Sequence, residues 1–321
     1  MSVLVFVEGA GGEIKKSSLE AVGYASALAQ KINTQAVALV IGNYSDDQIN
    51  SLGKFGASKV LSCKNDKLSQ PLPMPYASVI AEAAKKENAD TIILSRSSVV
   101  DAIASRLALK LGAGIVTNVV DLPDLSSGFK VKKSIYTGKA FAFYDLTSAK
   151  KVITIAKNAY SAVEGSGSAT VEAFDPQLSD SDFKVQIKET QKATGDVLLT
   201  EADIVVSGGR GLKGPENWNL VIDLAKALGA ATGCSKPVSD LDWRPHHEHV
   251  GQTGVKVSPN LYIALGISGA IQHLAGVNSS KVIVVVNKDP EAPFFKAADY
   301  GIVGDVFEVV PKLIEAAKAL K

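Results

Sequence analysis

Short apolar runs alternate along this chain with stretches of helical spacing. Val3–Val7, Thr91–Leu94 and Lys281–Val286 are apolar at almost every position rather than at every second position. Strands of this kind are buried on both faces, which is typical of parallel sheets covered by helices. We therefore expect an α/β fold that contains doubly wound parallel sheets.

The first half of the chain predicts one domain of this class. Its parallel strands are expected at Val3–Val7, Ala36–Ile41, Lys59–Ser62, Thr91–Leu94 and Ile115–Val120. Its helices are expected at Leu19–Lys31, Tyr76–Lys86 and Val99–Leu111. Strands and helices of these lengths, in alternation, indicate βαβ units.

The pattern changes between residues 129 and 156. Phe129–Tyr136 and Ala140–Tyr144 flank a short Thr-Gly-Lys turn, which predicts a β-hairpin. Lys151–Ile155 predicts a further strand. We interpret the whole region as an antiparallel appendage on the parallel sheet.

A length of 321 residues favours two domains. Gly165–Ser168 predicts a flexible loop, and Phe183–Ile187 predicts a last strand before the polar stretch Lys188–Gly195. We place the boundary within that stretch, which gives domains of residues 1–191 and 192–321.

The second domain repeats the alternation. Its strands are expected at Asp203–Val206, Leu261–Leu265 and Lys281–Val286. Its helices are expected at Asn217–Leu228, Ile271–Ala275 and Val306–Leu320. This pattern again predicts a doubly wound parallel sheet, although the two halves share no sequence repeat.

The composition limits the classes of partner. A net charge of +1 and an aromatic content of 6% give no basis for binding nucleic acid or an anionic membrane. No apolar run approaches the length of a bilayer span, and Met1–Glu8 lacks the features of a signal peptide. Cys63 and Cys234 have no metal-type spacing, so we expect buried, reduced thiols in a cytoplasmic protein.

Two glycine-containing motifs follow predicted strands. In Ser207–Gly211 the glycines let backbone N–H groups approach an anion, and Arg210 offers a fork of donors to a phosphate. Gly266–His273 opens a helix whose first N–H groups suit a pyrophosphate, with Ser268 as the cap. The alternatives are a tight surface turn and an ordinary capped helix with a packed histidine at position 273.

Amides and hydroxyls at other strand ends suit the polar parts of a nucleotide. Gln252 and Thr253 lie between two glycines, where they can bond to a ring edge or a sugar alcohol. Asn287 and Asp305 follow strands near the C-terminus, which places them for ribose or adenine. Asp305 can equally serve as the N-cap of the last helix.

Two polar runs complete the candidate motifs. The segment GCSKP puts the hydroxyl of Ser235 beside the cation of Lys236. The run His246–His249 invites a metal hypothesis, but only His247 and His249 would share one face of a strand. We therefore interpret that run as a polar loop.

The motifs GGRG, GCSKP, VGQTG, GISGAIQH, NKDPEAP and DYGIVGD occur in this order, and together they resemble the electron transfer flavoprotein alpha subunit family. The similarity is most specific over residues 203–311. The N-terminal region is more loosely similar, through its VLVFVE opening and its α/β-plus-hairpin layout. The resemblance implies a C-terminal FAD-binding domain of the Rossmann-like DHS type, in a redox carrier rather than an enzyme.

The resemblance also implies roles for single residues. Arg210 matches an arginine that contacts the cofactor, and Ser235 and Lys236 match a serine–arginine pair at the isoalloxazine. Lysine replaces the usual arginine here, and the two cations differ in geometry. His273 matches a histidine that donates toward the flavin O2. The other matched positions, near the ribityl chain, the pyrophosphate and the adenosine, are Val250, Gly251, Gln252, Thr253, Ser268, Gly269, Ala270, Ile271, Gln272, Asn287 and Asp305.

The implied partners are a beta subunit that holds AMP, acyl-CoA and related dehydrogenases of fatty acid β-oxidation, and a membrane quinone oxidoreductase. Two alternatives stay open at the level of sequence. One is an electron-bifurcating assembly that oxidises NADH through a second flavin on the partner. The other is a non-redox regulator that binds an adenine nucleotide through the N-terminal domain.

Overall fold

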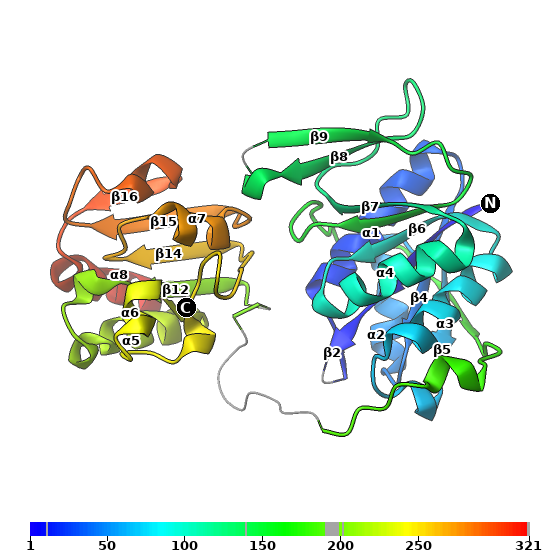
Figure 1. Ribbon diagram of the computed structural model, residues 1–321, viewed down its shortest axis with the longest axis horizontal. Helices are drawn as coiled ribbons and strands as arrows, with labels where there is room; N and C mark the ends of the chain where they lie inside the picture. The colour runs from blue at the N-terminus through cyan, green and yellow to red at the C-terminus, as the bar shows by residue number, and fades with distance from the viewer. Residues whose placement is uncertain (11, 139, 190–198, 201, 320–321) are drawn as a thin grey trace. The chain divides into compact units, whose positions relative to one another are not determined.

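The computed structural model describes residues 1–10, 12–138, 140–189, 199–200 and 202–319 (Figure 1). Contacts within the chain separate it into two compact units, residues 1–190 and 191–321. The predicted boundary between residues 191 and 192 lies outside the described residues. Each unit contains a parallel sheet with helices, so the predicted α/β class is confirmed.

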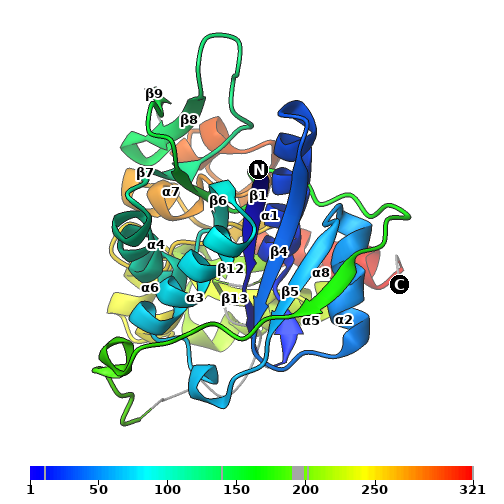
Figure 2. The same ribbon diagram turned by 90° about the vertical axis from the view of Figure 1, so that its right-hand side faces the viewer.

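The described residues of the first unit form one sheet with the strand order β11-β5-β4-β1-β6-β10-β7-β8-β9. Its strands are β1 (Ser2–Val7), β4 (Gln35–Ile41), β5 (Lys59–Cys63), β6 (Ala89–Ser95), β7 (Gly114–Val119), β8 (Lys130–Ile135), β9 (Ala140–Asp145), β10 (Lys151–Ile155) and β11 (Thr170–Ala173). β1 pairs in parallel with β4 and β6, and Figure 2 shows β1, β4 and β5 side by side. The small antiparallel pair β2 (Gly9–Ala10) and β3 (Glu13–Ile14) follows β1.

Both faces of this sheet are covered. The helices of the unit are α1 (Lys16–Lys31), α2 (Asp46–Ser51), α3 (Pro73–Lys86) and α4 (Ser98–Leu111). Val3 shares a core with Leu28 of α1, whereas Leu4 shares a second core with Ile80 of α3 and Leu107 of α4. Successive residues of a strand point to opposite faces, so β1 supplies apolar side chains to both cores. This explains why its sequence is apolar at every position.

The predicted hairpin is present, since β8 and β9 pair antiparallel from Lys130↔Asp145 to Ile135↔Ala140. β10 is not part of this appendage, and that prediction is wrong. It lies between β6 and β7 and pairs in parallel with both, with Ile153 opposite Ile93 and Val116. The neighbours of a strand are chosen by long-range packing, which local sequence does not show.

The end of this unit also differs from the prediction. Phe183–Ile187 is not a strand, because Phe183 closes a 3₁₀ turn (Asp180–Phe183) that begins with a capping box at Ser179. The buried carboxylate of Asp182 in this turn accepts a hydrogen bond from Ser78, at 2.9 Å. The edge strand is instead β11, which pairs in parallel with β5.

The second unit has a sheet with the strand order β13-β12-β14-β15-β16, and all its pairs are parallel. Its strands are β12 (Ile204–Gly208), β13 (Ala231–Cys234), β14 (Leu261–Leu265), β15 (Val282–Asn287) and β16 (Tyr300–Val303). Its helices are α5 (Asn219–Leu228), α6 (Lys236–Asp240), α7 (Ile271–Val277) and α8 (Val306–Ala319). The chain reverses its direction of progress across the sheet between β12 and β14. In folds of this kind the carboxyl ends of the two strands at that point flank the usual ligand crevice.

Two cores again lie on the two faces of the sheet. Tyr262 and Val285 pack with Phe294 on the face that α7 covers, whereas Ile263 packs with Leu224 of α5 on the other face. Among the described residues, no helix is both long and apolar enough to cross a membrane.

Candidate functional site

The loops after β12 and β14 cross each other at the carboxyl edge of the C-terminal sheet. The N–H of Gly209 donates to the carbonyl of Leu265 at 2.9 Å, and the N–H of Gly211 donates to the carbonyl of Gly266 at 3.0 Å. A Cβ added to Gly211 would lie 2.6 Å from the Cα of Gly266. Only glycine allows this approach, so the two predicted phosphate motifs are in direct contact.

The turn that leads into α7 is supported by contacts with Phe294 and Asn287. Gly269 has a φ of +85°, and a Cβ there would lie 2.4 Å from the backbone nitrogen of Phe294. The N–H of Phe294 donates to the carbonyl of Ser268 at 3.1 Å, and Asn287 Nδ2 donates to the carbonyl of Ile267 at 3.0 Å. Asn287 therefore supports this loop, which is a role that its place at a strand end did not reveal.

A third loop joins the first two. The N–H of Gln252 donates to the carbonyl of Gln272 at 2.7 Å, and Gly251 lies against Gly276 of α7. The predicted residues on the solvent side of these three loops are exposed: Arg210, Gln252, Thr253, Ser268, Ala270, Ile271 and Gln272. The apolar side chain at position 271 is 66% exposed at the start of a helix, where a ligand could cover it.

His273 is buried beneath this surface. Its Nε2 lies 2.9 Å from the hydroxyl of Tyr262, and its Nδ1 has no partner among the described residues. Burial, and to a smaller extent the charge of His249, lowers the pKa of His273 to about 4, while the backbone of Val250 acts in the opposite direction. The imidazole is therefore neutral at neutral pH.

The GCSKP segment contributes a buried hydroxyl and an exposed cation. Ser235 is 4% exposed, and its Oγ has no partner within the described part of the chain. Lys236 Nζ lies 2.7 Å from both carboxylate oxygens of Asp240, and this contact is the main reason why the pKa of that carboxyl is lowered. The cation expected near the flavin is thus engaged by a carboxylate one helical turn away. The adjacent Cys234 is a free, fully buried thiol, and burial raises its pKa to about 12.

Asp305 is a helix cap in this structure. Its Oδ1 accepts a hydrogen bond from the N–H of Phe307 at 3.0 Å, and its other oxygen lies 3.9 Å from Lys213 Nζ. The capping alternative is therefore realised, which leaves only part of the carboxylate available to a ligand.

The His246–His249 run forms a 3₁₀ turn and the residue that follows it. His246 Nδ1 bonds to Ser239 Oγ at 2.8 Å, Glu248 pairs with Arg244, and His249 is buried beside Gly254. The described residues contain no group of three or more His, Cys, Asp or Glu side chains placed to hold a metal ion.

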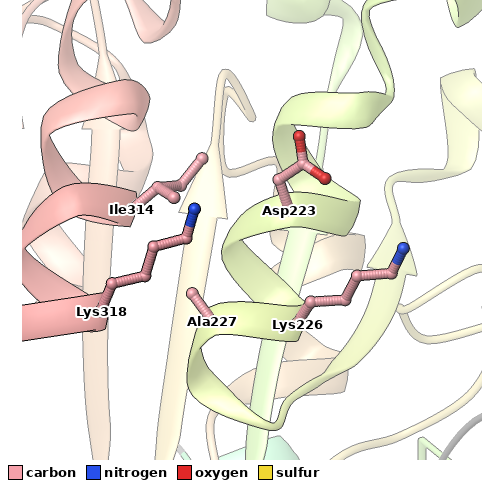
Figure 3. Close-up of a pocket in the computed structure, with 5 residues that line it drawn as sticks. All are labelled: Asp223, Lys226, Ala227, Ile314 and Lys318. Atoms are coloured by element: carbon pink, nitrogen blue, oxygen red, sulfur yellow. The ribbon is translucent and has the colours of Figure 1, made fainter. Parts of the chain in front are cut away.

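Two hollows lie away from these loops. One, of about 490 Å³, is a surface groove between α5 and α8, where Asp223, Ala227, Ile314 and Lys318 are seen in Figure 3. The other, of about 310 Å³, lies in the N-terminal unit above the carboxyl ends of β1, β4 and β5, and the charged residues in its described lining are Glu8 and Asp66. Neither combines a cation with unpartnered buried polar groups.

Two supporting residues, Tyr262 and Phe294, were not found from the sequence, and Ser207 was included only as the first residue of a glycine motif. Tyr262 and Phe294 are buried in the core on the face that α7 covers. Ser207 Oγ is buried without a hydrogen bond of normal geometry in the described chain, although its side chain lowers the pKa of Tyr262. A tyrosine in an otherwise apolar strand was the available signal, because a buried phenol needs a hydrogen-bonding partner.

These observations fit a dinucleotide with a polar ring. Buried polar atoms without partners are costly, and here three of them, on Ser207, Ser235 and His273, belong to one edge of one sheet. Arg210 is exposed beside the crossing glycines and makes no ion pair with any described residue. The set offers a phosphate-type cation, close backbone approach and unsatisfied hydrogen-bonding groups.

Comparison with known proteins decides the family. The model of the electron transfer flavoprotein domain matches residues 3–179, and that of the electron transfer flavoprotein FAD-binding domain matches residues 198–278. The chain belongs to the electron transfer flavoprotein alpha subunit family. The resemblance inferred from the motifs is thereby confirmed.

Relatives in this family align over nearly the whole chain. The electron transfer flavoprotein subunit alpha of Bacillus subtilis is 39% identical over 99% of this chain and 98% of its own length. The subunit alpha of Mycobacterium tuberculosis strain H37Rv is also 39% identical, over 99% of each chain. Protein FixB of Clostridium saccharobutylicum is 33% identical over 99% of this chain and 96% of its own.

Membership in this family identifies the chain as a flavoprotein electron carrier without a substrate of its own to turn over. The match to the FAD-binding domain includes the loops after β12 and β14, the GCSKP segment and His273. It ends at residue 278, before Asn287 and Asp305. The roles of those two residues therefore depend on the geometry described above.

Proposed function

We propose that this chain is the FAD-holding alpha subunit of a heterodimeric electron transfer flavoprotein. It accepts electrons from acyl-CoA and related flavin dehydrogenases and passes them to a membrane quinone oxidoreductase. The observation that carries this proposal is the meeting of three loops around buried polar groups without partners, in the unit that matches the FAD-binding domain. The beta subunit completes the heterodimer and holds AMP.

The crossing loops suit the phosphate half of FAD. Arg210 is exposed and can donate two parallel hydrogen bonds to phosphate oxygens. Ser268 adds a hydroxyl, and the glycines at 209 and 211 leave the backbone open to an anion. Asn287 and Asp305, beyond the neighbouring strands, lie toward the adenosine half.

The buried groups suit the isoalloxazine half. When bound, the flavin supplies one- and two-electron transfer, and the protein sets its potential. His273 is a neutral donor rather than a cation, because burial lowers its pKa to about 4. Ser235 offers a buried hydroxyl, whereas Lys236 is partly neutralised by Asp240. Gln252 and Thr253, which are exposed on the third loop, would bond to the polar edge of the ring.

The β8–β9 hairpin supports a partner for the N-terminal unit. β9 is the last strand in the described sheet, and Phe141 and Phe143 on it are 52% and 69% exposed. Tyr136 and Tyr144 of the same hairpin are 75% and 45% exposed. Exposed aromatic side chains on an edge strand are typical of a protein–protein interface. We assign this surface to the beta subunit.

The alternatives have less support. The described lining of the N-terminal hollow contains no cation, and Lys15 nearby is engaged by Glu8, which disfavours a phosphate and hence a nucleotide regulator. Bifurcation would depend on a second flavin held by the partner. Cys63 and Cys234 are free and buried, which suits the reducing cytoplasm that we propose as the location.

Co-purification of the chain with its beta subunit, followed by absorption spectroscopy and cofactor extraction, tests this proposal. We expect a yellow heterodimer with one FAD and one AMP, reduced by an acyl-CoA dehydrogenase and its substrate. Two FAD molecules and reduction by NADH would instead establish a bifurcating assembly. A colourless preparation that stays colourless after addition of FAD would refute flavin binding.

A further inference from the structure

One buried pair of polar side chains underlies the isoalloxazine half of the site. Tyr262 is fully buried in β14, an inner strand flanked by β12 and β15. Its hydroxyl lies 2.9 Å from Nε2 of His273, the third residue of α7. The pair thus connects the middle of the sheet with the helix that faces the proposed ligand.

Aromatic packing fixes the plane of the imidazole. The His273 ring meets the ring of Phe294 edge-on, with centroids 5.7 Å apart, and the Tyr262 ring stacks on that of Phe294 at 6.4 Å. The backbone of Phe294 in turn contacts Gly269 so closely that a Cβ there would clash. The histidine therefore cannot turn to exchange its two nitrogens without displacing core side chains.

The direction of the hydrogen bond follows from the phenol. Burial raises the pKa of Tyr262, so the phenol keeps its proton. A buried O–H requires an acceptor, and Nε2 lies 2.9 Å from this hydroxyl. Ser207 is also near and lowers the pKa of Tyr262 by hydrogen bonding, so it acts as a donor to the phenol oxygen and leaves Nε2 as the acceptor. Because a neutral imidazole has one donor and one acceptor nitrogen, the ring proton then belongs to Nδ1.

We propose that Tyr262 is a positioning residue that holds His273 as the Nδ1–H tautomer and leaves Nδ1–H as the donor to a ligand carbonyl oxygen. Nδ1 makes no hydrogen bond of normal geometry with a described residue, although the backbone of Val250 lies close enough to raise the pKa of the ring. This inference depends on the proposed flavin function for the identity of the ligand. The tautomer itself depends only on the contacts of Tyr262 and His273.

Nitrogen NMR of the histidine side chains tests the inference in the heterodimer with a ¹⁵N-histidine-labelled alpha chain. The chain has four histidines, so the signal absent from His273→Gln identifies residue 273. We expect Nδ1 to be protonated and Nε2 to accept a hydrogen bond in the wild type. In Tyr262→Phe, which keeps the ring volume, the proton should move wholly or partly to Nε2.

Tyr76→Phe is the matched control, because Tyr76 is a buried tyrosine of the N-terminal unit that donates to the carbonyl of Leu68 at 3.0 Å. It should leave the His273 signals unchanged. A wild-type protein with the proton on Nε2, or a tautomer unaltered by Tyr262→Phe, would overturn the inference. If Tyr262→Phe does not fold, the position of the His273 ring proton in the wild-type protein still tests the inference.

Flavin binding separates this inference from the proposed function. In Tyr262→Phe, the dissociation constant for FAD should rise about tenfold, the effect of losing one well-placed donor. A wild type that binds no flavin refutes the function, yet its tautomer remains readable. A wild type that binds flavin with Nε2 protonated refutes only the role of Tyr262.

Discussion

The two sheets of this chain have the same parallel architecture, yet their carboxyl edges differ in which charged and ring groups are left without partners. In the C-terminal unit, Ser207 Oγ, Ser235 Oγ and His273 Nδ1 are buried without partners in the described chain. In the N-terminal unit, the hydroxyls of Ser62 and Ser95 are also buried without described partners, but the carboxylate of Glu8, which follows β1, is bonded to Lys15 at 2.6 Å and to Ser97 at 2.5 Å.

The comparison teaches that topology and buried hydroxyls are not enough to make a ligand site, because both edges have them, whereas the exposed cation of Arg210 and the unpartnered ring nitrogen of His273 belong to the C-terminal edge. In both units the chain adds strands first on one side of its first strand and then on the other. The carboxyl edge at that point of reversal favours ligand binding. Glu8 accepts hydrogen bonds from Lys15 and from Ser97, the N-cap of α4, so its charge is paired within the chain at the edge of the N-terminal hollow. At the C-terminal edge, Arg210 is exposed and remains available to a ligand.

The largest effect is expected at Gly269. Gly269→Ala should cost roughly 4 kcal/mol and abolish flavin retention, because the new Cβ meets the Phe294 backbone at 2.4 Å in addition to the strain at positive φ. Gly229→Ala is the matched control, since its φ is +67° with nothing within 4 Å. It should cost only about 1 kcal/mol and keep the flavin. Urea unfolding and absorption spectra measure both, and equal losses would refute the packing argument.

The second largest effect is a loss of stability at low pH. The folded pKa of His273, about 4, lies below its ordinary value of 6.5, so this group stabilises the fold above pH 6.5 and the stability is lost as the pH falls toward 4. The loss should reach about 3 kcal/mol. Both tryptophans, Trp218 and Trp243, lie in the C-terminal unit, so their fluorescence reports its unfolding alone. His273→Gln should flatten the dependence between pH 6.5 and 4, and an unchanged slope would contradict it.

The third prediction compares one substitution at the carboxyl edge of each sheet. Glu8→Gln should cost about 2 kcal/mol of unfolding free energy, because it breaks a largely buried ion pair, and should leave the flavin content unchanged. Ser235→Ala should raise the unfolding free energy of the apoprotein by about 1 kcal/mol, because it removes a buried hydroxyl without a described partner, but should weaken flavin binding. Circular dichroism during urea unfolding and flavin titration measure both. The reverse outcome would contradict the distinction between a carboxylate that is paired within the chain and a hydroxyl that is available to a ligand.

The smallest effect on the fold is expected at Arg210. Arg210→Gln should raise the dissociation constant for FAD about tenfold to a hundredfold, the contribution of a charge-assisted hydrogen bond, with the stability of the apoprotein unchanged. Lys226→Gln, in the groove between α5 and α8, removes an equal charge on the same unit and should leave the affinity unchanged. Equal losses in both variants would indicate a diffuse charge effect rather than a phosphate contact.

Much of the fold followed from local sequence. The continuous apolar runs located β1, β4, β6, β14 and β15 and gave the parallel α/β class, because a strand buried on both faces has no polar side. The place of β10 did not follow, since its partners β6 and β7 are determined by the assembled sheet. β11 escaped notice because Thr170–Ala173 forms a mostly exposed edge with no apolar run.

The candidate site was predicted less completely from the sequence than the fold. Strand ends and glycines located the loops around Arg210 and Ser268, since both features are local. The Lys236–Asp240 ion pair was within reach of the sequence, because the two residues are four apart on a helix. The contact between Tyr262 and His273 was not, because it joins a strand to a helix through the core.

The free thiol of Cys234 has a consequence for a protein that would carry a reactive cofactor. It is fully buried at the end of β13, next to Ser235, and burial raises its pKa to about 12. The thiolate is the form that peroxide attacks, so this sulfur is almost entirely in its inert form at neutral pH. Reduced flavins can leak electrons to oxygen, and the protein would tolerate the resulting peroxide at this cysteine without losing the strand that bears the site.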